Sequence, residues 1–394
     1  MAAILVSDAE QRSALAVVRS LGRAGHTVRV CSHWQKPLAG ASRYARSAVV
    51  VPDPLEQPQA YVAALREQVE RGKIDVLLPV TEASLLAVLP ERERMGAALP
   101  FPSFSAFERI CNKAEVAEAA RRVGIGAPLQ IRLEQPGDRT RLQERELEFP
   151  LVLKPARSVF GLNGGRRKQS VRHVRDINAL NVLLGALPPE AYPVLLQQPI
   201  FGPGVGVFLL LDAGELLGAF AHRRIREKPP WGGVSVYRES IALDPELLGA
   251  SVSLLRQFDW QGAAMVEFKV DERTGIPYIM EINGRFWGSL QLAIDAGVDF
   301  PALLIDAITG GKPEPVLSYR HGVRSRWFWG DVDHLLLRLR GTDPAFGSNM
   351  AEGGRARAVV DFLKAFSPTS RNEILRLSDP YPALRESVNW FQGR

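Results

Sequence analysis

Two glutamates and one asparagine have the residue types and the spacing of a divalent-cation site. Glu267 and Glu281 lie in the apolar stretches "MVEFKV" and "YIMEIN", which are separated by the turn-forming segment "DERTG". This pattern predicts a β-hairpin in which strand pairing brings both carboxylates together on one face. Asn283 follows Glu281 by two residues, so its side chain points to the same face of the strand.

Two chemical interpretations fit these acids. Neighbouring carboxylates repel each other unless a cation lies between them. Two carboxylates and an amide carbonyl form an oxygen-rich ligand set that suits Mg²⁺ and leaves positions for water and phosphate oxygens. Alternatively, the acids pair across the strands with Lys269 or Arg285. The pattern alone favours neither interpretation.

A lysine next to a glycine-containing loop offers a second kind of chemistry. Lys154 ends the apolar stretch "FPLVLK" and precedes residues 155–168, which contain three glycines. Backbone N–H groups of such a loop can face phosphate oxygens, with the lysine as a point charge. An ordinary hairpin loop fits the same residues. Further on, "LLQQPIFG" (195–202) is an extended segment that can pair with the edge of an adenine.

The elements expected around these residues begin with an α/β region. Helices are predicted at 10–26 and 58–71, and strands alternate with them. This alternation predicts a parallel sheet with helices on both faces, and ligands of such sheets bind beyond the carboxyl ends of the strands. Four polar residues lie there, although helix capping explains them equally well. No GxGxxG follows the first strand. The predicted strands are 2–7, 27–32, 47–54 and 74–80, and the polar residues are Ser7, Asp8, Thr81 and Glu82.

Beyond residue 100 the pattern changes to a mixture of helices and antiparallel strands. A helix is predicted at 113–123 and another at 245–258, and the turn "DAGE" joins two strands between them. These changes divide the chain into an N-terminal α/β domain, a second domain with two subdomains, and a C-terminal extension without a recognisable motif. The expected bounds are 1–104, then 105–312 (subdomains 105–195 and 196–312), then 313–394.

Composition limits the class of protein. The 394 residues carry 49 basic and 43 acidic side chains, a net charge of +6, without a long basic run. This predicts no nucleic-acid partner. Two cysteines are too few for a disulfide framework or a zinc site of cysteines alone. The lack of a signal peptide or of an apolar run long enough to span a bilayer predicts a cytoplasmic protein.

Taken together and in order, these features resemble the ATP-grasp superfamily over about residues 1–310. The family has a lysine that opens a helix, a lysine before a glycine-rich loop, a hinge strand, and a glutamate followed by E-x-N-x-R. Here the corresponding pieces are Lys113 in "CNKAEVAEAARRVGI", Lys154 in "PLVLKPA", the segment "LLQQPI", and Glu267 with "MEINGRFWG". The resemblance implies an N-terminal pre-ATP-grasp domain followed by an ATP-grasp domain whose two subdomains clasp ATP.

The resemblance also implies a role for each matching residue. Lys113 and Lys154 would contact the nucleotide phosphates, and Arg285 would stabilise charge on the transferred phosphoryl group. Gln197, Gln198 and Ile200 would face adenine, and Glu267, Glu281 and Asn283 would hold Mg²⁺, two ions by the family pattern, with Mn²⁺ as an alternative. Arg223, Arg224, Arg226 and Lys228 would approach the phosphates or the acceptor, with Arg226 catalytic and Lys228 on the nucleotide.

The implied activity is ligation of a carboxylate to an amine, with ATP converted to ADP through an acyl phosphate. The loop "KPARSVFGLNGG" looks more like the carboxylate–amine ligase and carbamoyl-phosphate-synthase-like branches than like the biotin carboxylases, whose loop is richer in glycine. Many relatives carry an acid just after the hinge that binds the ribose, and "FGPGVGVF" has none. Bicarbonate activation and a non-catalytic ATP-binding module remain alternatives. The carboxylate, the amine and the oligomeric state stay open, a homodimer included.

Overall fold

The N-terminal region is built on a parallel sheet, as its alternating pattern predicts. The computed structural model describes residues 1–142, 147–162, 164–341, 354–367 and 369–393. In the first sheet the strand order is β3-β2-β1-β4, and every pairing is parallel. Buried apolar residues of the first helix pack on this sheet, so the predicted α/β class is confirmed. The elements are β1 (Ala3–Val6), α1 (Arg12–Arg23), β2 (Thr27–Ser32), β3 (Ala45–Val50), α2 (Pro58–Gly72), β4 (Val76–Leu78) and α3 (Glu82–Val88).

A second, smaller sheet carries the glycine-containing loop. Its strand order is β5-β10-β6-β9, and the loop itself forms the separate hairpin β7–β8. This hairpin reaches back to the N-terminal region, where the backbone N–H of Arg166 donates to the carbonyl of Leu55 at 2.6 Å. The elements are α4 (Phe104–Cys111), α5 (Lys113–Arg122), β5 (Gln130–Leu133), β6 (Leu151–Pro155), β7 (Val159–Leu162), β8 (Gly165–Lys168), β9 (Arg172–Val174), α6 (Ile177–Gly185) and β10 (Val194–Gln197).

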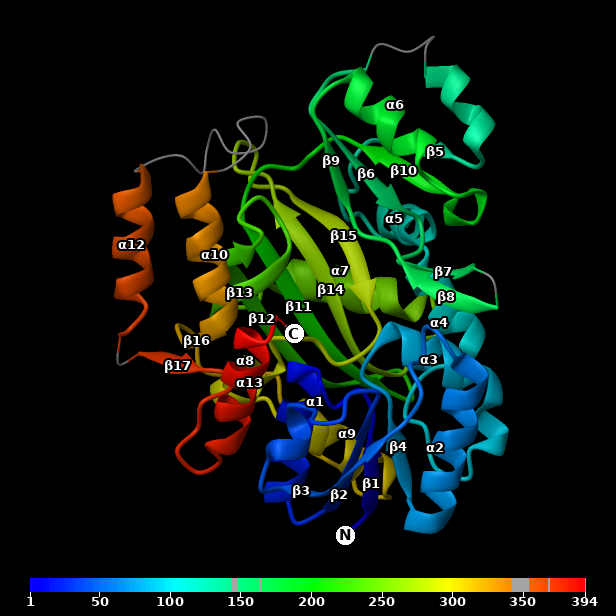
Figure 1. Cartoon of the computed structure of the whole chain (residues 1–394), viewed down its shortest axis with the longest axis vertical. Coiled ribbons are helices and arrows are strands. Elements are labelled where there is room, and N and C mark those ends of the chain that lie inside the picture. Colours follow the sequence, from blue (N-terminus) through cyan, green and yellow to red (C-terminus); the bar gives the residue numbers. More distant parts are fainter. Residues whose placement is uncertain (143–146, 163, 342–353, 368, 394) are drawn as a thin grey trace.

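A seven-stranded sheet of order β15-β14-β11-β12-β13-β16-β17 runs through the middle of the molecule (Figure 1). The predicted turn "DAGE" joins β11 to β12, with positive φ at both Ala213 and Gly214, as a two-residue hairpin turn requires. The elements are β11 (Gly204–Asp212), β12 (Glu215–Lys228), β13 (Val234–Ser240), α7 (Pro245–Arg256), β14 (Gly262–Val270), β15 (Pro277–Asn283), α8 (Leu290–Ala296), α9 (Phe300–Ile308), β16 (Arg324–Arg326) and β17 (Ser370–Asn372).

The chain after residue 312 continues this sheet and then returns to the N-terminal region. β16 pairs with β13 and β17 pairs with β16, so the expected boundary at residue 312 falls before two further strands of the same sheet. The domain division therefore stays a prediction. In the described part of this segment, three helices flank these strands, at the left of Figure 1. They are α10 (Phe328–Arg340), α12 (Gly354–Lys364) and α13 (Tyr381–Phe391). Short 3₁₀ helices lie at Ala39–Ala41, Leu89–Arg94, Pro136–Leu142 and Pro189–Ala191.

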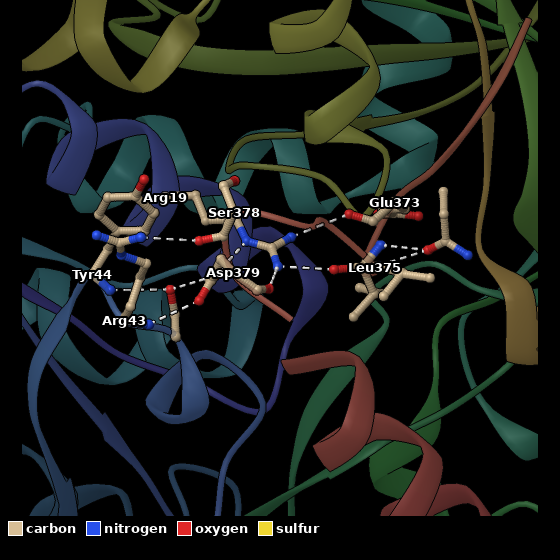
Figure 2. A network of polar contacts seen from close by, with 10 residues as sticks. Arg19, Arg43, Tyr44, Glu373, Leu375, Ser378 and Asp379 are labelled. Carbon is tan, nitrogen blue, oxygen red and sulfur yellow. Dashed lines mark hydrogen bonds and ion pairs between the residues drawn. The ribbon is translucent and has the colours of Figure 1, made fainter. Parts of the chain in front are cut away.

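A buried ion pair joins the two ends of the chain. Figure 2 shows Arg19 of α1 donating to Asp379, with Nε and Oδ2 2.8 Å apart. The other Asp379 oxygen accepts from the backbone N–H of Arg43 at 2.9 Å, and Arg19 also donates to the carbonyl of Ile374. Both charged side chains are almost fully buried. The C-terminal segment is therefore part of the packing of the N-terminal domain.

Among the described residues, none of the helices combines the length and apolar character needed to cross a membrane.

Candidate active site

The predicted carboxylate pair forms in the structure. Strands β14 and β15 are antiparallel, and Glu267 lies directly opposite Glu281. Asn283 donates its amide N–H to Glu281 Oε1 at 3.0 Å, while its carbonyl accepts from Arg285 Nη2 at 3.0 Å. Hydrogen bonds thus link Glu281, Asn283 and Arg285 in one row, and Glu267 lies across from Glu281 on the neighbouring strand.

The cations beside the two glutamates come from other elements than the hairpin. Arg224 Nη2 lies 2.6 Å from Glu267 Oε2, and Lys113 Nζ lies 3.3 Å from Glu281 Oε2. Cross-strand pairing with Lys269 or Arg285, the alternative raised by the sequence, is not the arrangement found between these side chains. The acids instead face cations that converge from β12 and from the N-terminus of α5.

The two carboxylates have different electrostatic surroundings. Burial raises the pKa of Glu267, and the charge of Arg224 opposes this shift. Burial also disfavours ionisation of Glu281, but Lys113, the Asn283 amide and Lys154 outweigh it and lower the pKa of Glu281 to about 2. Glu281 is therefore an anion at neutral pH, and it lies among the cations Lys113, Lys154 and Arg285.

Both predicted lysines lie beside β15. Lys113, held by the Asn112 cap at the start of α5, donates to Ser158 Oγ at 2.8 Å. Lys154 lies one residue before the end of β6, with its Nζ 3.7 Å from the sulfur of Met280. Burial is the main cause that lowers the pKa of Lys154 to about 8, with Glu281 opposing the shift.

These residues line one large cavity of about 1020 Å³. The hinge segment contributes Gln197 and Ile200, and the hairpin β7–β8 contributes Lys168. Gln198 points elsewhere, since its side chain donates to the carbonyl of Glu148 at 3.0 Å and its backbone N–H donates to Leu129. Of the three residues expected to face adenine, the structure brings two to the cavity.

The two cations expected further along β12 are engaged by the C-terminal extension. Arg226 lines the cavity, but its Nε and Nη2 each lie 2.6 Å from a carboxylate oxygen of Asp331. Lys228 forms an ion pair with Asp333 and lies 5.7 Å from the ring centroid of Trp327. Neither side chain is grouped with the carboxylate pair, so their expected roles on the phosphates stay predictions.

The polar residues at the end of the N-terminal sheet have mainly a structural role. Asp8 accepts from Ser84 Oγ at 2.6 Å and from the backbone N–H of Val80 at 3.1 Å. Thr81 caps α3 through Ser84, as the capping interpretation predicts. Glu82 differs from these two residues in its charged surroundings. Burial raises the pKa of Glu82, and the nearby cations Lys113 and Arg285 oppose that shift.

Sequence reasoning missed several cavity residues. Glu272, in the turn of the β14–β15 hairpin, lines the cavity beside the hinge, where its backbone N–H donates to the carbonyl of Phe201 at 2.9 Å. It supplies an acid near the hinge although "FGPGVGVF" contains none. The acidic turn "DERTG" is the only sign of this acid in the sequence. Its contact with the hinge joins residues far apart in the chain, so the sequence does not reveal it. Arg12, His222 and Trp287 also line the cavity.

Comparisons with known proteins find similarity to one protein family and to two curated proteins. A family described as "ATP-grasp in the biosynthetic pathway with Ter operon" matches residues 191–330. The carbamoyl phosphate synthase large chain of Thermotoga sp. (strain RQ2) is 21% identical over 358 residues, 80% of this chain and 31% of that protein. The D-aspartate ligase of Enterococcus faecium (strain Aus0004) is 22% identical over 282 residues, 67% of this chain and 66% of that protein.

The fold is shared with solved structures as well. The crystal structure of L-amino acid ligase from Bacillus licheniformis has a TM-score of 0.61 and 18% identity, covering 79% of this chain and 75% of that one. The resemblance to the ATP-grasp superfamily that the sequence predicts is confirmed by the family match over residues 191–330, by these curated relatives and by the shared fold. The chain spans less than two thirds of the length of both curated relatives, so their activities bear on it only as proposals.

Proposed function

We propose that this protein is an ADP-forming ligase that activates a carboxylate with ATP and joins it to an amine. The observation that carries the proposal is the row Glu267, Glu281, Asn283 and Arg285, which faces Lys113 and Lys154 in one cavity. Phosphoryl transfer requires mainly positioning and neutralisation of charge, and this set of side chains supplies both. The names of two relatives, D-aspartate ligase and L-amino acid ligase, support an amine acceptor.

In the proposed reaction, a carboxylate oxygen of the substrate attacks the γ-phosphorus of ATP. The bond between this phosphorus and the β–γ bridging oxygen breaks, and ADP leaves with that oxygen. An acyl phosphate remains. The amine nitrogen then attacks the acyl carbon, the carbon–oxygen bond to phosphate breaks, inorganic phosphate leaves, and the amine loses a proton. Lys154 and Lys113 would hold the phosphates, and Arg285 would lie against the transferred group.

The donor set fits a magnesium site. Within the described residues no three His, Cys, Asp or Glu side chains converge. The ligands would be Glu267, Glu281 and the Asn283 carbonyl, completed by phosphate and water oxygens, as Mg²⁺ prefers. When bound, two Mg²⁺ ions would supply positive charge at the phosphate oxygens. Because Arg224 and Lys113 already neutralise the glutamates, these cations would have to share them with the metal.

The nature of the products tests the proposal. The protein is incubated with Mg²⁺, ATP, hydroxylamine and a panel of proteinogenic amino acids, their D-isomers, short dicarboxylic acids and bicarbonate. Hydroxylamine traps an activated acyl group whatever the natural amine, so a true substrate is expected to give ADP together with a hydroxamate.

Other products select other mechanisms. AMP in place of ADP would overturn the acyl-phosphate route. ADP release with bicarbonate alone would favour the carbamoyl-phosphate-like alternative, which the Thermotoga relative supports. ATP binding without any product would favour a non-catalytic module.

Nucleotide binding is expected to weaken with rising pH because of Lys154. Its pKa of about 8 means that it carries a positive charge at pH 7 and progressively loses it above pH 8. The phosphates attract only the charged form, so the dissociation constant of MgADP should rise between pH 7 and pH 9, with a limiting slope of about tenfold per pH unit. Isothermal titration calorimetry at several pH values measures this slope.

The variant Lys154→Met provides the control. It should bind MgADP more weakly at pH 7 and should lose the dependence on pH in this interval. An equal slope in Lys154→Met would mean that a different group titrates, and full affinity in that variant would show that Lys154 does not contact the phosphates.

A further inference from the structure

An arginine reaches across one strand of the central sheet to contact a candidate metal ligand. Arg224 lies on β12 and Glu267 on β14, and β11 lies between these two strands. A Cβ atom added to Gly204 of β11 would be 2.7 Å from Cδ of Arg224. Glycine at this position therefore leaves the surface of β11 open, so that the arginine side chain crosses it and places Nη2 2.6 Å from Glu267 Oε2.

A second carboxylate binds the same guanidinium group. Nη1 of Arg224 donates to Oε1 of Glu227 at 3.0 Å. Successive side chains of a strand point to alternate faces, so residues three apart normally lie on opposite faces. The register of β12 against β13 shifts on both sides of Arg226, and this bulge lets the side chains of Arg224 and Glu227 meet. The bulge thus provides Arg224 with a second acidic partner.

The three charged side chains form one cluster inside the cavity. Arg224, Glu227 and Glu267 all line the cavity, and their side chains are 11%, 13% and 17% exposed. Burial disfavours the charge of Arg224, but Glu267 and Glu227 outweigh burial and raise the pKa of the guanidinium. The carbonyl of Glu227 accepts from Nδ1 of His334 on α10 at 2.6 Å. The C-terminal extension therefore holds Glu227 in position.

A divalent cation and the guanidinium compete for Glu267. Mg²⁺ lies about 2.1 Å from a ligand oxygen, so an ion on Oε2 needs the position that Nη2 of Arg224 occupies. An ion on the other oxygen would lie only a few ångströms from the guanidinium and would repel it. In either case the contact between Arg224 and Glu267 weakens, whereas the contact between Arg224 and Glu227 remains available.

We propose that Glu227 is a positioning residue of the metal site, which holds the guanidinium of Arg224 when Mg²⁺ binds Glu267. In the structure Arg224 bonds both carboxylates, and with the metal bound it keeps its counter-ion through Glu227. A buried cation that loses its counter-ion is strongly destabilising, so this second partner makes Glu267 easier to transfer to the metal. The inference rests on the ligase function proposed above and adds a residue that reaches the metal ligand only through Arg224.

The contribution of the metal to nucleotide binding measures this role without any turnover. Isothermal titration calorimetry gives the dissociation constant of ADP with Mg²⁺ and again with EDTA, and the ratio of the two constants is the metal-dependent gain. Formation of MgADP in solution is common to all variants, and a direct contact between Arg224 and phosphate contributes to both constants. Glu227→Gln should lower the gain at least about fivefold, because Arg224 then keeps Glu267 as its one anionic partner.

A double substitution tests whether Glu227 acts through Arg224. Arg224→Gln removes the competing cation, so its gain should equal or exceed that of wild type. In this background Glu227→Gln should have no further effect. An equal loss in both backgrounds would overturn the proposal, because Glu227 would then bind the metal or act by its charge alone. A lower gain in Arg224→Gln by itself would also overturn it, since the arginine would then support Glu267 instead of competing for it.

Gly204→Ala tests the same contact without a change of charge, and it keeps the proposal testable if Arg224→Gln does not fold. The added Cβ would be 2.7 Å from Cδ of Arg224 and 3.1 Å from Oε1 of Glu227, so these side chains must move. The gain should fall as it does in Glu227→Gln. An unchanged gain in both variants would contradict the proposed role of Glu227.

Glu239→Gln is the matched control. Glu239 on β13 also bonds two arginines, Arg223 at 2.7 Å and Arg324 at 2.8 Å, and its side chain is 10% exposed, but it does not line the cavity. It should leave the gain unchanged, and a fall equal to that of Glu227→Gln would reduce the effect to a general loss of negative charge. The expected pattern of gains without any hydroxamate would reject the ligase function alone. Hydroxamate formation with the same gain in every variant would reject this inference alone.

Discussion

Replacing Glu281 with glutamine is expected to lower Mg²⁺-dependent ATP turnover by at least about tenfold, which corresponds to a loss of roughly 1.4 kcal/mol of transition-state stabilisation. Glu281 is an anion at neutral pH, with its pKa lowered to about 2, and it lies opposite Glu267. Glutamine keeps the shape of the side chain and the fold but removes the charge that a bound metal ion needs. Coupled measurement of ADP release as a function of Mg²⁺ concentration checks this result.

Glu115→Gln is a matched control for this substitution. The side chains of Glu115 and Glu281 are each 32% exposed, and each forms an ion pair, Glu115 with Arg109 at 2.6 Å. Glu115 lies outside the cavity lining, so its loss should leave turnover unchanged. Full activity in a folded Glu281→Gln protein would refute the metal assignment, whereas equal losses in both variants would point to a general effect of charge removal.

The largest effect on stability is expected for Asp331→Asn. Asp331 is completely buried and accepts from Arg226 and from Arg326, with Nε of Arg326 2.6 Å from Oδ2. Removing its charge leaves two guanidinium groups without their counter-ion inside the protein. Breaking a buried ion pair in this way costs about 3–5 kcal/mol. The midpoint of unfolding in urea should therefore fall clearly below that of wild type.

Asp333→Asn, two residues further along α10, measures the same change near the surface. The side chains of the Lys228–Asp333 pair are 36% and 21% exposed, so solvent screens the pair, and its loss should cost no more than about 1 kcal/mol. Equal shifts of the urea midpoint in the two variants would mean that burial of Asp331 does not determine the strength of its pairs.

The parts of the site whose residues lie close together in the sequence could be predicted from the sequence alone. The hairpin of Glu267 and Glu281 follows from two apolar stretches joined by a five-residue turn, and the register places the acids opposite each other. The N-terminal parallel sheet follows from alternating strands and helices. Lys113 and Lys154 were found because Lys113 opens a helix and Lys154 lies near the end of a strand, where a side chain can reach a ligand.

Other parts of the site depend on contacts that no local pattern encodes. Arg12 is held by Glu373, 361 residues further along the chain. Glu272 reaches the cavity only because the hairpin turn folds against the hinge. Gln198 turns away because the carbonyls of Glu148 and Leu129, which lie outside the strands, accept its hydrogen bonds, and these contacts cannot be seen in the segment "LLQQPI". The C-terminal extension has no motif, and its part in the cavity wall arises entirely from tertiary packing.

The pairing of Arg19 with Asp379 has a consequence for folding during synthesis. The two residues are 360 positions apart, so a ribosome that adds 5–20 residues per second completes Arg19 on the order of 20–70 s before Asp379. During that interval α1 cannot bury its arginine against a counter-ion from Asp379. The N-terminal domain therefore emerges first but completes this part of its packing only after the segment around Asp379 has been synthesised.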